Sequence, residues 1–191
     1  MVLFQPTTWH GQRSSRQGVF RGPDRRAAAG NLRSEILATL HLMVGLPFSG
    51  KTTLAKKLER ECPALRLTPD EWQVPLFGQD AEEPEHDARH SLIEAMLWKI
   101  ASRALELGTN VILDFGFWAR EEREDFRSRA KQLGASSEVH FLDVPEDELW
   151  RRLAERNSQP SQESFLIPAE MMKPWIEVFQ RPTPDELVRR E

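Results

Sequence analysis

Residues 45–52 read GLPFSGKT and fit the pattern G-x-x-x-x-G-K-[ST]. The apolar run Ala38–Val44 precedes this motif, and residues 50–61 follow it with the composition of a helix. The two glycines let the backbone turn tightly and bring its N–H groups close to phosphate oxygens. The positive end of the following helix points at the same place. The stretch therefore predicts a phosphate-binding loop between a buried strand and a helix.

Each fixed position of this loop has a chemical task. The Lys51 ammonium would reach the β- and γ-phosphates of a nucleotide, and the Thr52 hydroxyl would coordinate Mg²⁺. ATP and Mg²⁺ are the cofactors that we expect. The residues expected to bind them are Gly45, Pro47, Phe48, Ser49, Gly50, Lys51, Thr52 and Thr53.

Strand and helix patterns alternate on the C-terminal side of the loop. Short apolar runs predict strands at residues 38–44, 65–67, 111–113 and 139–144. Amphipathic or charged segments predict helices at residues 50–61, 86–107, 120–133, 146–157 and 168–179. Such alternation is typical of an α/β protein in which helices cover both faces of a parallel sheet, that is, a three-layer α/β/α fold.

The charges divide the chain of 191 residues into two parts. Residues 1–33 contain six arginines and one aspartate, a net charge of +5, which leaves −9 on the remaining 158 residues. The first segment has no sustained period and is rich in Arg, Gly, Ser and Gln, so we expect a disordered basic tail at 1–33 and a folded domain at 34–191. An acidic folded part is a poor match to a dedicated duplex-DNA binder, although one nucleic-acid end could still enter a local basic cleft.

Several classes of protein are excluded or disfavoured. The longest apolar stretch, residues 36–48, is too short to span a bilayer, and the single cysteine, Cys62, allows no intrachain disulfide. We therefore expect no membrane partner and a cytoplasmic location. The guanine-reading motif N-K-x-D is absent, which argues against a GTPase. The oligomeric state is unreadable from the sequence.

Further motifs resemble those of one protein family. The segments are residues 45–53, 68–72, 111–118, 144–145, 151–157 and 181–186. Together they resemble the P-loop kinase-like ATP-binding proteins of the adenylate-kinase-like branch, which are similar to the kinase part of polynucleotide kinases, to zeta toxins and to chloramphenicol phosphotransferase. The resemblance implies a P-loop NTPase fold with strand order 2-3-1-4 and a short helical lid. It also implies that residues 181–186 pack near the adenine.

Two aspartates are the candidate catalytic carboxylates. The resemblance and the strand order place Asp70 and Asp114 on either side of one cleft, at the carboxyl ends of their strands. Asp70 would take the proton of the acceptor hydroxyl, and Asp114 would hold Mg²⁺ or orient the acceptor. Each has a structural alternative. Thr68 and Glu71 fit a capping box that only starts a helix, and Asp114 could bond to local backbone N–H groups.

Four arginines are weighed in the same way. Arg152 and Arg156 share a helix face, and in the related kinases lid arginines close over the triphosphate; the alternative is a surface helix with a Glu148–Arg152 pair. Arg120 at a helix N-terminus opposes the helix dipole and is a candidate for the acceptor or a phosphate. Arg123 is expected to form a solvated pair with a neighbouring acid.

The remaining candidates carry weaker expectations. Phe115, Phe117 and Trp118 could line an acceptor pocket or could pack under the next helix. His86 and His90 are expected to be exposed helix residues rather than metal ligands. The histidines at 41 and 140 lie in predicted strands and are expected to be core or edge residues with hydrogen-bond partners.

The sequence thus predicts a phosphotransferase that moves the γ-phosphate of ATP to a hydroxyl of a small molecule or nucleotide. Two alternatives remain. One is a 5′-hydroxyl polynucleotide kinase, which requires a basic groove beside Asp70. The other is a nucleotide-binding regulatory or toxin–antitoxin component with weak ATPase activity.

Overall fold

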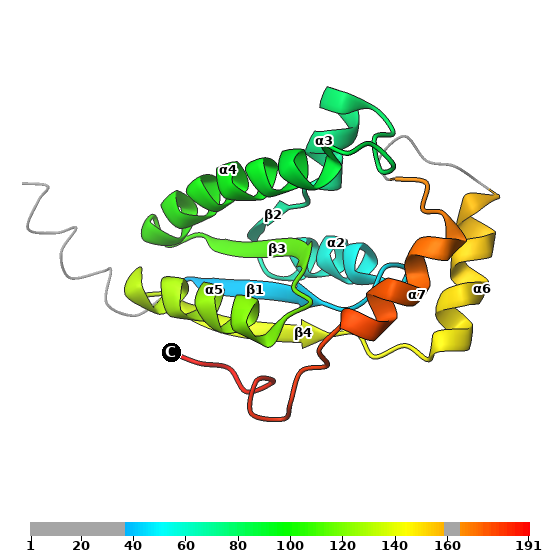
Figure 1. Cartoon of the computed structure of the whole chain (residues 1–191). Helices are drawn as coiled ribbons and strands as arrows, with labels where there is room; N and C mark the ends of the chain where they lie inside the picture. The colour runs from blue at the N-terminus through cyan, green and yellow to red at the C-terminus, as the bar shows by residue number, and fades with distance from the viewer. Residues whose placement is uncertain (1–36, 159–164) are drawn as a thin grey trace, which may run out of the picture. The chain divides into compact units, whose positions relative to one another are not determined.

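Four parallel strands form the central sheet of the computed structural model, which describes residues 37–158 and 165–191. The strands are β1 (Thr39–Val44), β2 (Ala64–Leu67), β3 (Asn110–Gly116) and β4 (Ser136–Phe141). Their order is β2-β3-β1-β4, as expected (Figure 1). The predicted tail at 1–33, the predicted start of the domain at residue 34 and most of the polar loop after residue 157 lie outside the described residues.

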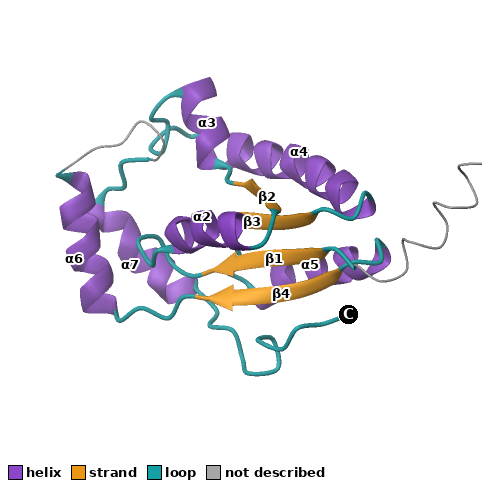
Figure 2. Ribbon diagram, turned by 180° about the vertical axis from the view of Figure 1, so that it is seen from behind, coloured by secondary structure: helices purple, strands orange, loops and turns teal. Residues whose placement is uncertain are grey.

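Six helices are described, and they cover both faces of the sheet, which confirms the three-layer α/β/α fold (Figure 2). They are α2 (Lys51–Glu61), α3 (Asp70–Phe77), α4 (His86–Glu106), α5 (Arg120–Gln132), α6 (Glu146–Asn157) and α7 (Ala169–Val178). No helix in the described ranges is both long enough and apolar enough to cross a membrane.

Strand alternation separates two apolar cores. Leu40, Leu42 and Val44 of β1 face α4 and α5, and they pack with Val111 and Leu113 of β3. The residues between them point to the other face, where Met43 and Ile112 pack on Ala55 of α2. Because both faces of β1 and β3 are buried, these central strands read as continuous apolar runs, which explains why the sequence identified them.

The edge strand β4 differs from the prediction. The strand was expected at residues 139–144, whereas it occupies Ser136–Phe141. Its first residues are serines, and Thr39 of β1 pairs with Ser136 in the parallel register. The Thr39 and Ser136 hydroxyls lie 2.9 Å apart and hydrogen-bond to each other, so a polar start is accommodated inside the sheet. Hydrophobic periodicity misses such a start.

Arg123 is a clear correction to the sequence analysis. It was expected to be solvated beside a neighbouring acid, but its side chain is fully buried and pairs with Glu186, which is 1% exposed (Nε–Oε2 2.7 Å). It also donates hydrogen bonds to the carbonyls of Phe117 and Trp118. The Thr183–Glu186 segment therefore starts no helix; its glutamate ties the C-terminal segment to α5 and to the loop after β3.

The buried Arg123–Glu186 pair leads to a stability prediction. Glu186→Gln or Arg123→Leu alone should lower the free energy of unfolding by about 3–5 kcal/mol, because each leaves an uncompensated buried partner. The double variant Arg123→Leu/Glu186→Leu should recover much of that loss. Urea unfolding measures the cycle, with Arg103→Ala as the control because its pair with Glu106 is exposed and should cost under about 1 kcal/mol. Additive single losses would contradict the coupling.

Candidate phosphate-binding and transfer site

The phosphate-binding loop connects β1 to α2, as the motif predicts. Gly45 at its start and Gly50 at its end both have positive φ, which favours glycine at these positions. A Cβ at Gly45 would lie 2.7 Å from the Ser49 hydroxyl oxygen, so no larger residue fits there without a shift. The Gly45 N–H donates to the Gly116 carbonyl over 3.2 Å and fastens the loop to the end of β3.

The loop borders a cleft of about 1150 Å³. Of the predicted nucleotide-binding residues, six line this cleft: Pro47, Phe48, Gly50, Lys51, Thr52 and Thr53. Asp70, Asp114, Arg152 and Arg156 line it too, so the structure brings together all the predicted catalytic residues except Arg120. The cleft therefore brings the loop together with the predicted catalytic carboxylates Asp70 and Asp114 and the predicted cations Lys51, Arg152 and Arg156.

Lys51 is half-buried at the wall of the cleft. Its Nζ donates a hydrogen bond to the Leu46 carbonyl over 2.8 Å. Burial lowers the pKa of Lys51 to about 8, while the charges of Asp114 and Asp70 oppose that shift. The two carboxylates therefore lie close to this ammonium, in the position where a transferred phosphoryl group needs cations and bases.

Asp114 lies inside β3, two residues before its end, and is 5% exposed. Its Oδ2 accepts a hydrogen bond from the Thr68 hydroxyl over 3.3 Å, but its buried Oδ1 has no hydrogen-bond partner. Burial raises the pKa of Asp114, and the Thr52 hydroxyl and Lys51 ammonium act in the opposite sense. An unpaired buried carboxylate oxygen beside a threonine hydroxyl is an arrangement that suits a hard cation.

Asp70 begins α3, as predicted, but the capping box does not form. The Glu71 carboxylate pairs with Arg66 over 2.9 Å, and the Thr68 hydroxyl bonds to Asp114. Burial raises the pKa of Asp70, while nearby His90 and Lys51 act to lower it. Thr68 and Glu71 therefore have other partners, while Asp70 lies in the first turn of α3, where an acidic side chain also suits the helix dipole.

Helix α6 presents Arg152 and Arg156 to the phosphate-binding loop. The Arg152 guanidinium donates to the carbonyls of Phe48 and Ser49 over 3.2 and 3.3 Å and also bonds to Glu148, so the predicted Glu148–Arg152 pair is present as well. The Arg156 guanidinium lies 5.7 Å from the centre of the Phe48 ring. Both cations therefore border the side of the cleft where phosphates would bind.

Arg120 has a different place. Its guanidinium bonds to Thr183 and pairs with Asp185 at 2.7 Å on the exposed surface, and it is absent from the lining of the cleft. The unfavourable position of a cation at the start of α5 is thus offset by a partner from the C-terminal segment. That partner is 65 residues away in sequence, too far to be recognised from local spacing.

The sequence analysis missed a polar group at the other end of the cleft. His86 and His90 are half-buried rather than exposed, and both line the cleft. Burial alone would lower the pKa of His90, but the Glu94 carboxylate, 3.3 Å away, raises it above the ordinary value. Glu122 also lines this end, where burial raises its pKa. The i, i+4 spacing of the two histidines was the one available signal.

The aromatic residues after β3 pack against the next helix, as one of the two expectations had it, and they also line the cleft. Phe115, Phe117 and Trp118 all line the cleft. Phe117 is 1% exposed and packs edge-on against Phe126 of α5, so it is also part of the core. The Trp118 ring meets Trp175 of α7 at 5.5 Å. The cleft therefore has one rigid apolar wall.

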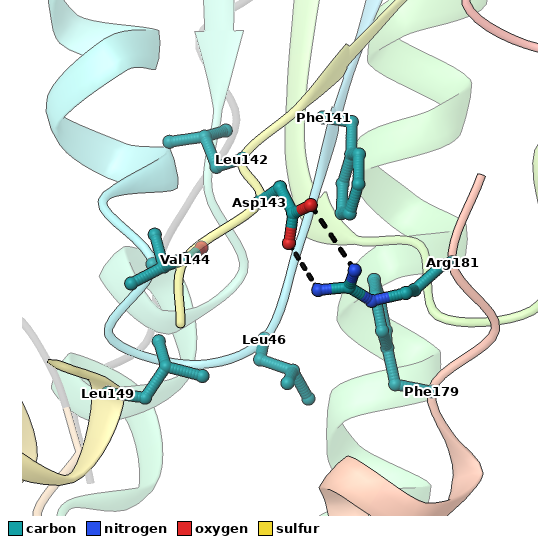
Figure 3. A pocket seen from close by; sticks show the side chains of 9 residues that line it. Leu46, Phe141, Leu142, Asp143, Val144, Leu149, Phe179 and Arg181 are labelled. Atoms are coloured by element: carbon teal, nitrogen blue, oxygen red, sulfur yellow. Dashed lines mark hydrogen bonds and ion pairs between the residues drawn. The ribbon is translucent and has the colours of Figure 1, made fainter. Parts of the chain in front are cut away.

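A smaller pocket lies on the other side of the loop. Its lining includes Leu46 and Ser49 of the loop, and Phe179 and Arg181 of the C-terminal segment. Figure 3 shows the Arg181 guanidinium facing the Asp143 carboxylate across this pocket. The other two predicted nucleotide-binding residues do not line the large cleft. Ser49 lines this smaller pocket, and Gly45 fastens the start of the loop to β3.

The parallel sheet has the strand order β2-β3-β1-β4, and the G-x-x-x-x-G-K-T loop follows β1. Together these features define a P-loop kinase-like fold. Residues 40–182 match the family described as AAA domain (AAA_33), and the chain belongs to that family of P-loop kinases. The comparison with curated proteins returned no match.

Solved structures show the same fold at low sequence identity. The chain is similar to a component of the Pnkp1/Rnl/Hen1 RNA repair complex (24% identity, TM-score 0.63), covering 76% of this chain and 45% of that one. It is also similar to Kti12 of Chaetomium thermophilum in complex with ADP-AlF3, with 23% identity and a TM-score of 0.57. That match covers 76% of this chain and 82% of that one. A third similar structure is a sugar kinase from Janibacter, with 19% identity and a TM-score of 0.56. That match covers 78% of this chain and 82% of that one. The chain thus spans less than half the length of the RNA repair protein.

The lowered pKa of Lys51 gives a pH prediction. Phosphate binding needs the protonated ammonium, so the affinity for ATP should hold below pH 8 and should fall by up to about tenfold per pH unit above it. Calorimetric titration with a non-hydrolysable ATP analogue at constant Mg²⁺ measures this.

Lys51→Arg is the matched control, because a guanidinium keeps its charge at every pH in this range. Its affinity should be weaker but independent of pH. A wild-type affinity that stays constant well above pH 8 would contradict the assignment of Lys51 as the titrating phosphate ligand.

Proposed function

We propose that the protein is an ATP-dependent kinase that transfers the γ-phosphoryl group to a hydroxyl of a small molecule or nucleotide. The observation that carries the proposal is the meeting of Lys51, Asp70 and Asp114 at the phosphate-binding loop, in one cleft. Asp70, the first residue of α3, adds a second carboxylate to this cleft, where it could contact an acceptor hydroxyl. The complex of the similar Kti12 with ADP-AlF3 supports a nucleotide as the ligand of this fold.

The loop and its cations would position the triphosphate. Backbone N–H groups at the start of α2 face the phosphate site, and Lys51 would bridge the β- and γ-phosphates. Arg152 holds the loop through the Phe48 and Ser49 carbonyls, while Arg156 is placed to neutralise charge that develops during transfer.

Thr52 and Asp114 are the residues that would hold Mg²⁺. The fit rests on the Asp114 Oδ1 atom, which is buried and has no hydrogen-bond partner, and on the Thr52 hydroxyl beside it. Oxygen ligands of this kind suit Mg²⁺. When bound, Mg²⁺ supplies charge neutralisation for the β- and γ-phosphate oxygens.

Asp70 would accept the proton of the attacking hydroxyl. Its side chain is half-buried in the cleft, where burial raises the pKa of the carboxyl and makes it a stronger base than an exposed aspartate. Transfer would break the bond between the γ-phosphorus and the bridging oxygen and form a bond to the acceptor oxygen. The products are ADP and a phosphomonoester, and the hydroxyl proton passes to Asp70.

The charge of the cleft favours a small acceptor over a nucleic-acid end. The cations among the lining residues come from the loop, α2 and α6, and α4 and α5 contribute no Lys or Arg to the described lining. They contribute Asp87, Glu94 and Glu122 instead. A polynucleotide kinase requires a basic groove beside Asp70, and repulsion by these carboxylates disfavours a phosphate backbone there.

Asp70→Asn tests the catalytic carboxylate. It should lower kcat by about 10²–10⁴-fold with the dissociation constant of ATP nearly unchanged, because the base acts on the acceptor and not on the nucleotide. Coupled measurement of ADP release with acceptor gives kcat. Glu71→Gln is the control, since Glu71 is the next residue, also lines the cleft and pairs with Arg66. Equal losses for both variants would show that Asp70 has no special role.

Acceptor charge is tested by a panel of hydroxyl compounds at saturating ATP. Neutral sugars and nucleosides should stimulate ADP release, whereas an oligonucleotide with a 5′-hydroxyl should not. Glu94→Gln should reduce the discrimination against the oligonucleotide. End-labelling of the oligonucleotide at a rate above that of every small acceptor would establish the polynucleotide kinase instead. ATP hydrolysis that no acceptor stimulates would favour the regulatory protein with weak ATPase activity.

A further inference from the structure

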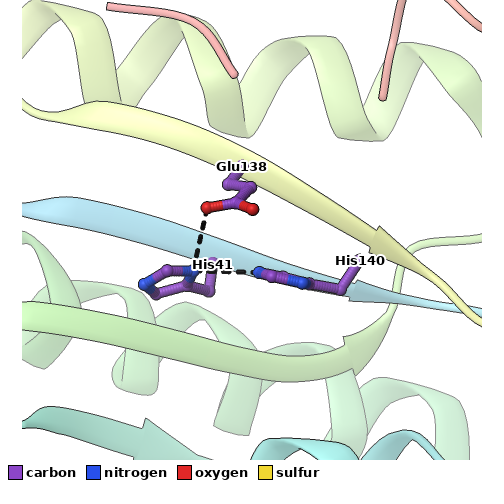
Figure 4. A group of neighbouring side chains, drawn as sticks. All are labelled: His41, Glu138 and His140. Carbon is purple, nitrogen blue, oxygen red and sulfur yellow. Dashed lines mark hydrogen bonds and ion pairs between the residues drawn. The ribbon is translucent and has the colours of Figure 1, made fainter. Parts of the chain in front are cut away.

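A group of three metal-ligating side chains lies outside the cleft, on the face of the sheet that bears α2. The parallel register places His41 of β1 opposite Glu138 of β4, and Met43 opposite His140. Strand alternation puts Glu138 and His140 on the same face of β4. Figure 4 shows the three side chains converging across the two strands. The expectation that both histidines have hydrogen-bond partners is confirmed.

The distances suit one ion. The His41 Nδ1 atom lies 2.9 Å from His140 Nε2 and 3.8 Å from a Glu138 carboxylate oxygen. All three ligand atoms lie within 4.8 Å of one another, and no other such group of three occurs among the described residues. With bonds of about 2.0–2.1 Å, tetrahedral geometry separates ligand atoms by roughly 3.3 Å. Small side-chain rotations would therefore close these three atoms around an ion.

The state of the ligands also suits a metal. His41 is buried and His140 is half-buried, which disfavours the charged imidazolium and favours the neutral form that binds metals. The side chain of His41 is 8% exposed and that of Glu138 is 38% exposed, which leaves a route from solvent. Two facing neutral rings share a single N–H between their nearest nitrogens. For an ion to bind there, the donor ring must take the tautomer that carries its proton on the other nitrogen, so that both facing nitrogens offer lone pairs.

One neighbouring charge opposes the ion. The Arg189 guanidinium donates hydrogen bonds to the Thr39 and Ser136 hydroxyls, at 3.3 and 2.9 Å, and is close enough to lower the pKa of His41. The Glu138 carboxylate offsets part of this repulsion. Removing the Arg189 charge should therefore tighten the site.

We propose that His41, Glu138 and His140 bind one divalent transition-metal ion of the zinc type, with water as a fourth ligand. Two imidazoles and one carboxylate suit Zn²⁺, whereas Mg²⁺ prefers oxygen ligands alone. The site is therefore chemically distinct from the proposed magnesium site at Thr52 and Asp114. Bound metal would cross-link β1 to the edge strand β4 and stabilise the folded chain.

Calorimetric titration of the untagged full chain with Zn²⁺, in excess Mg²⁺, tests the proposal. One ion should bind per chain, and His140→Gln or Glu138→Gln should weaken binding at least about tenfold. The other three of the five histidines supply matched controls: His10→Gln, His86→Gln and His90→Gln should change the affinity less than twofold. Absence of saturable binding, or binding that His140→Gln leaves unchanged, would overturn the site.

A stability measurement separates a lost ligand from a misfolded variant. Zn²⁺ should raise the thermal midpoint of the wild-type chain and should not raise that of His140→Gln, although both chains should show the same far-ultraviolet circular dichroism without metal. Arg189→Gln should bind Zn²⁺ more tightly than the wild type. Equal midpoint shifts in the wild type and His140→Gln would contradict a metal site at these residues.

Discussion

The parallel pairing of β1 with β3 is the constraint on which the site depends. It aligns Leu42 with Leu113 and Val44 with Gly116, and so brings the phosphate-binding loop beside Asp114. The hydrogen bond from the Gly45 N–H to the Gly116 carbonyl continues this pairing beyond the strand. Without this pairing the lysine and the carboxylate would belong to separate parts of the molecule. The chemistry of the cleft is thus a consequence of strand order.

The buried charges around this pairing compensate one another only in part. Lys51 lies between two carboxylates, each with a pKa that burial raises, and its own pKa is lowered. Such opposing shifts within one cleft are typical of sites that move protons or bind phosphate. The pair Arg123–Glu186 is the structural counterpart: both side chains are hydrogen-bonded, and neither lines the cleft. Burial of a charged group therefore does not by itself distinguish a functional site from a structural ion pair. An unpaired buried oxygen such as Asp114 Oδ1 does distinguish them.

Local patterns in the sequence predicted the elements that are buried on both faces and the loop between β1 and α2. These patterns failed where the environment of a residue depends on a partner that is far away in the sequence. Arg123 was expected to be solvated, and Arg120 was expected to contact an acceptor or a phosphate. Instead Glu186 and Asp185 of the C-terminal segment pair with them. The polar start of β4 is stable only because Thr39 bonds to Ser136. The roles of the predicted site residues stay predictions. No motif in the sequence indicated that side chains of α4, α5 and α7 line the other end of the cleft.

The central claim is that the cleft transfers a phosphoryl group to a hydroxyl instead of releasing it to water. Phosphorus NMR of the wild-type chain with ATP, Mg²⁺ and a mixture of neutral hydroxyl compounds tests this directly. We predict that a phosphomonoester resonance grows in step with ADP, since Asp70 lines the cleft and is the proposed base for the acceptor hydroxyl. Growth of inorganic phosphate alone, with no ester at any stage, would contradict the account.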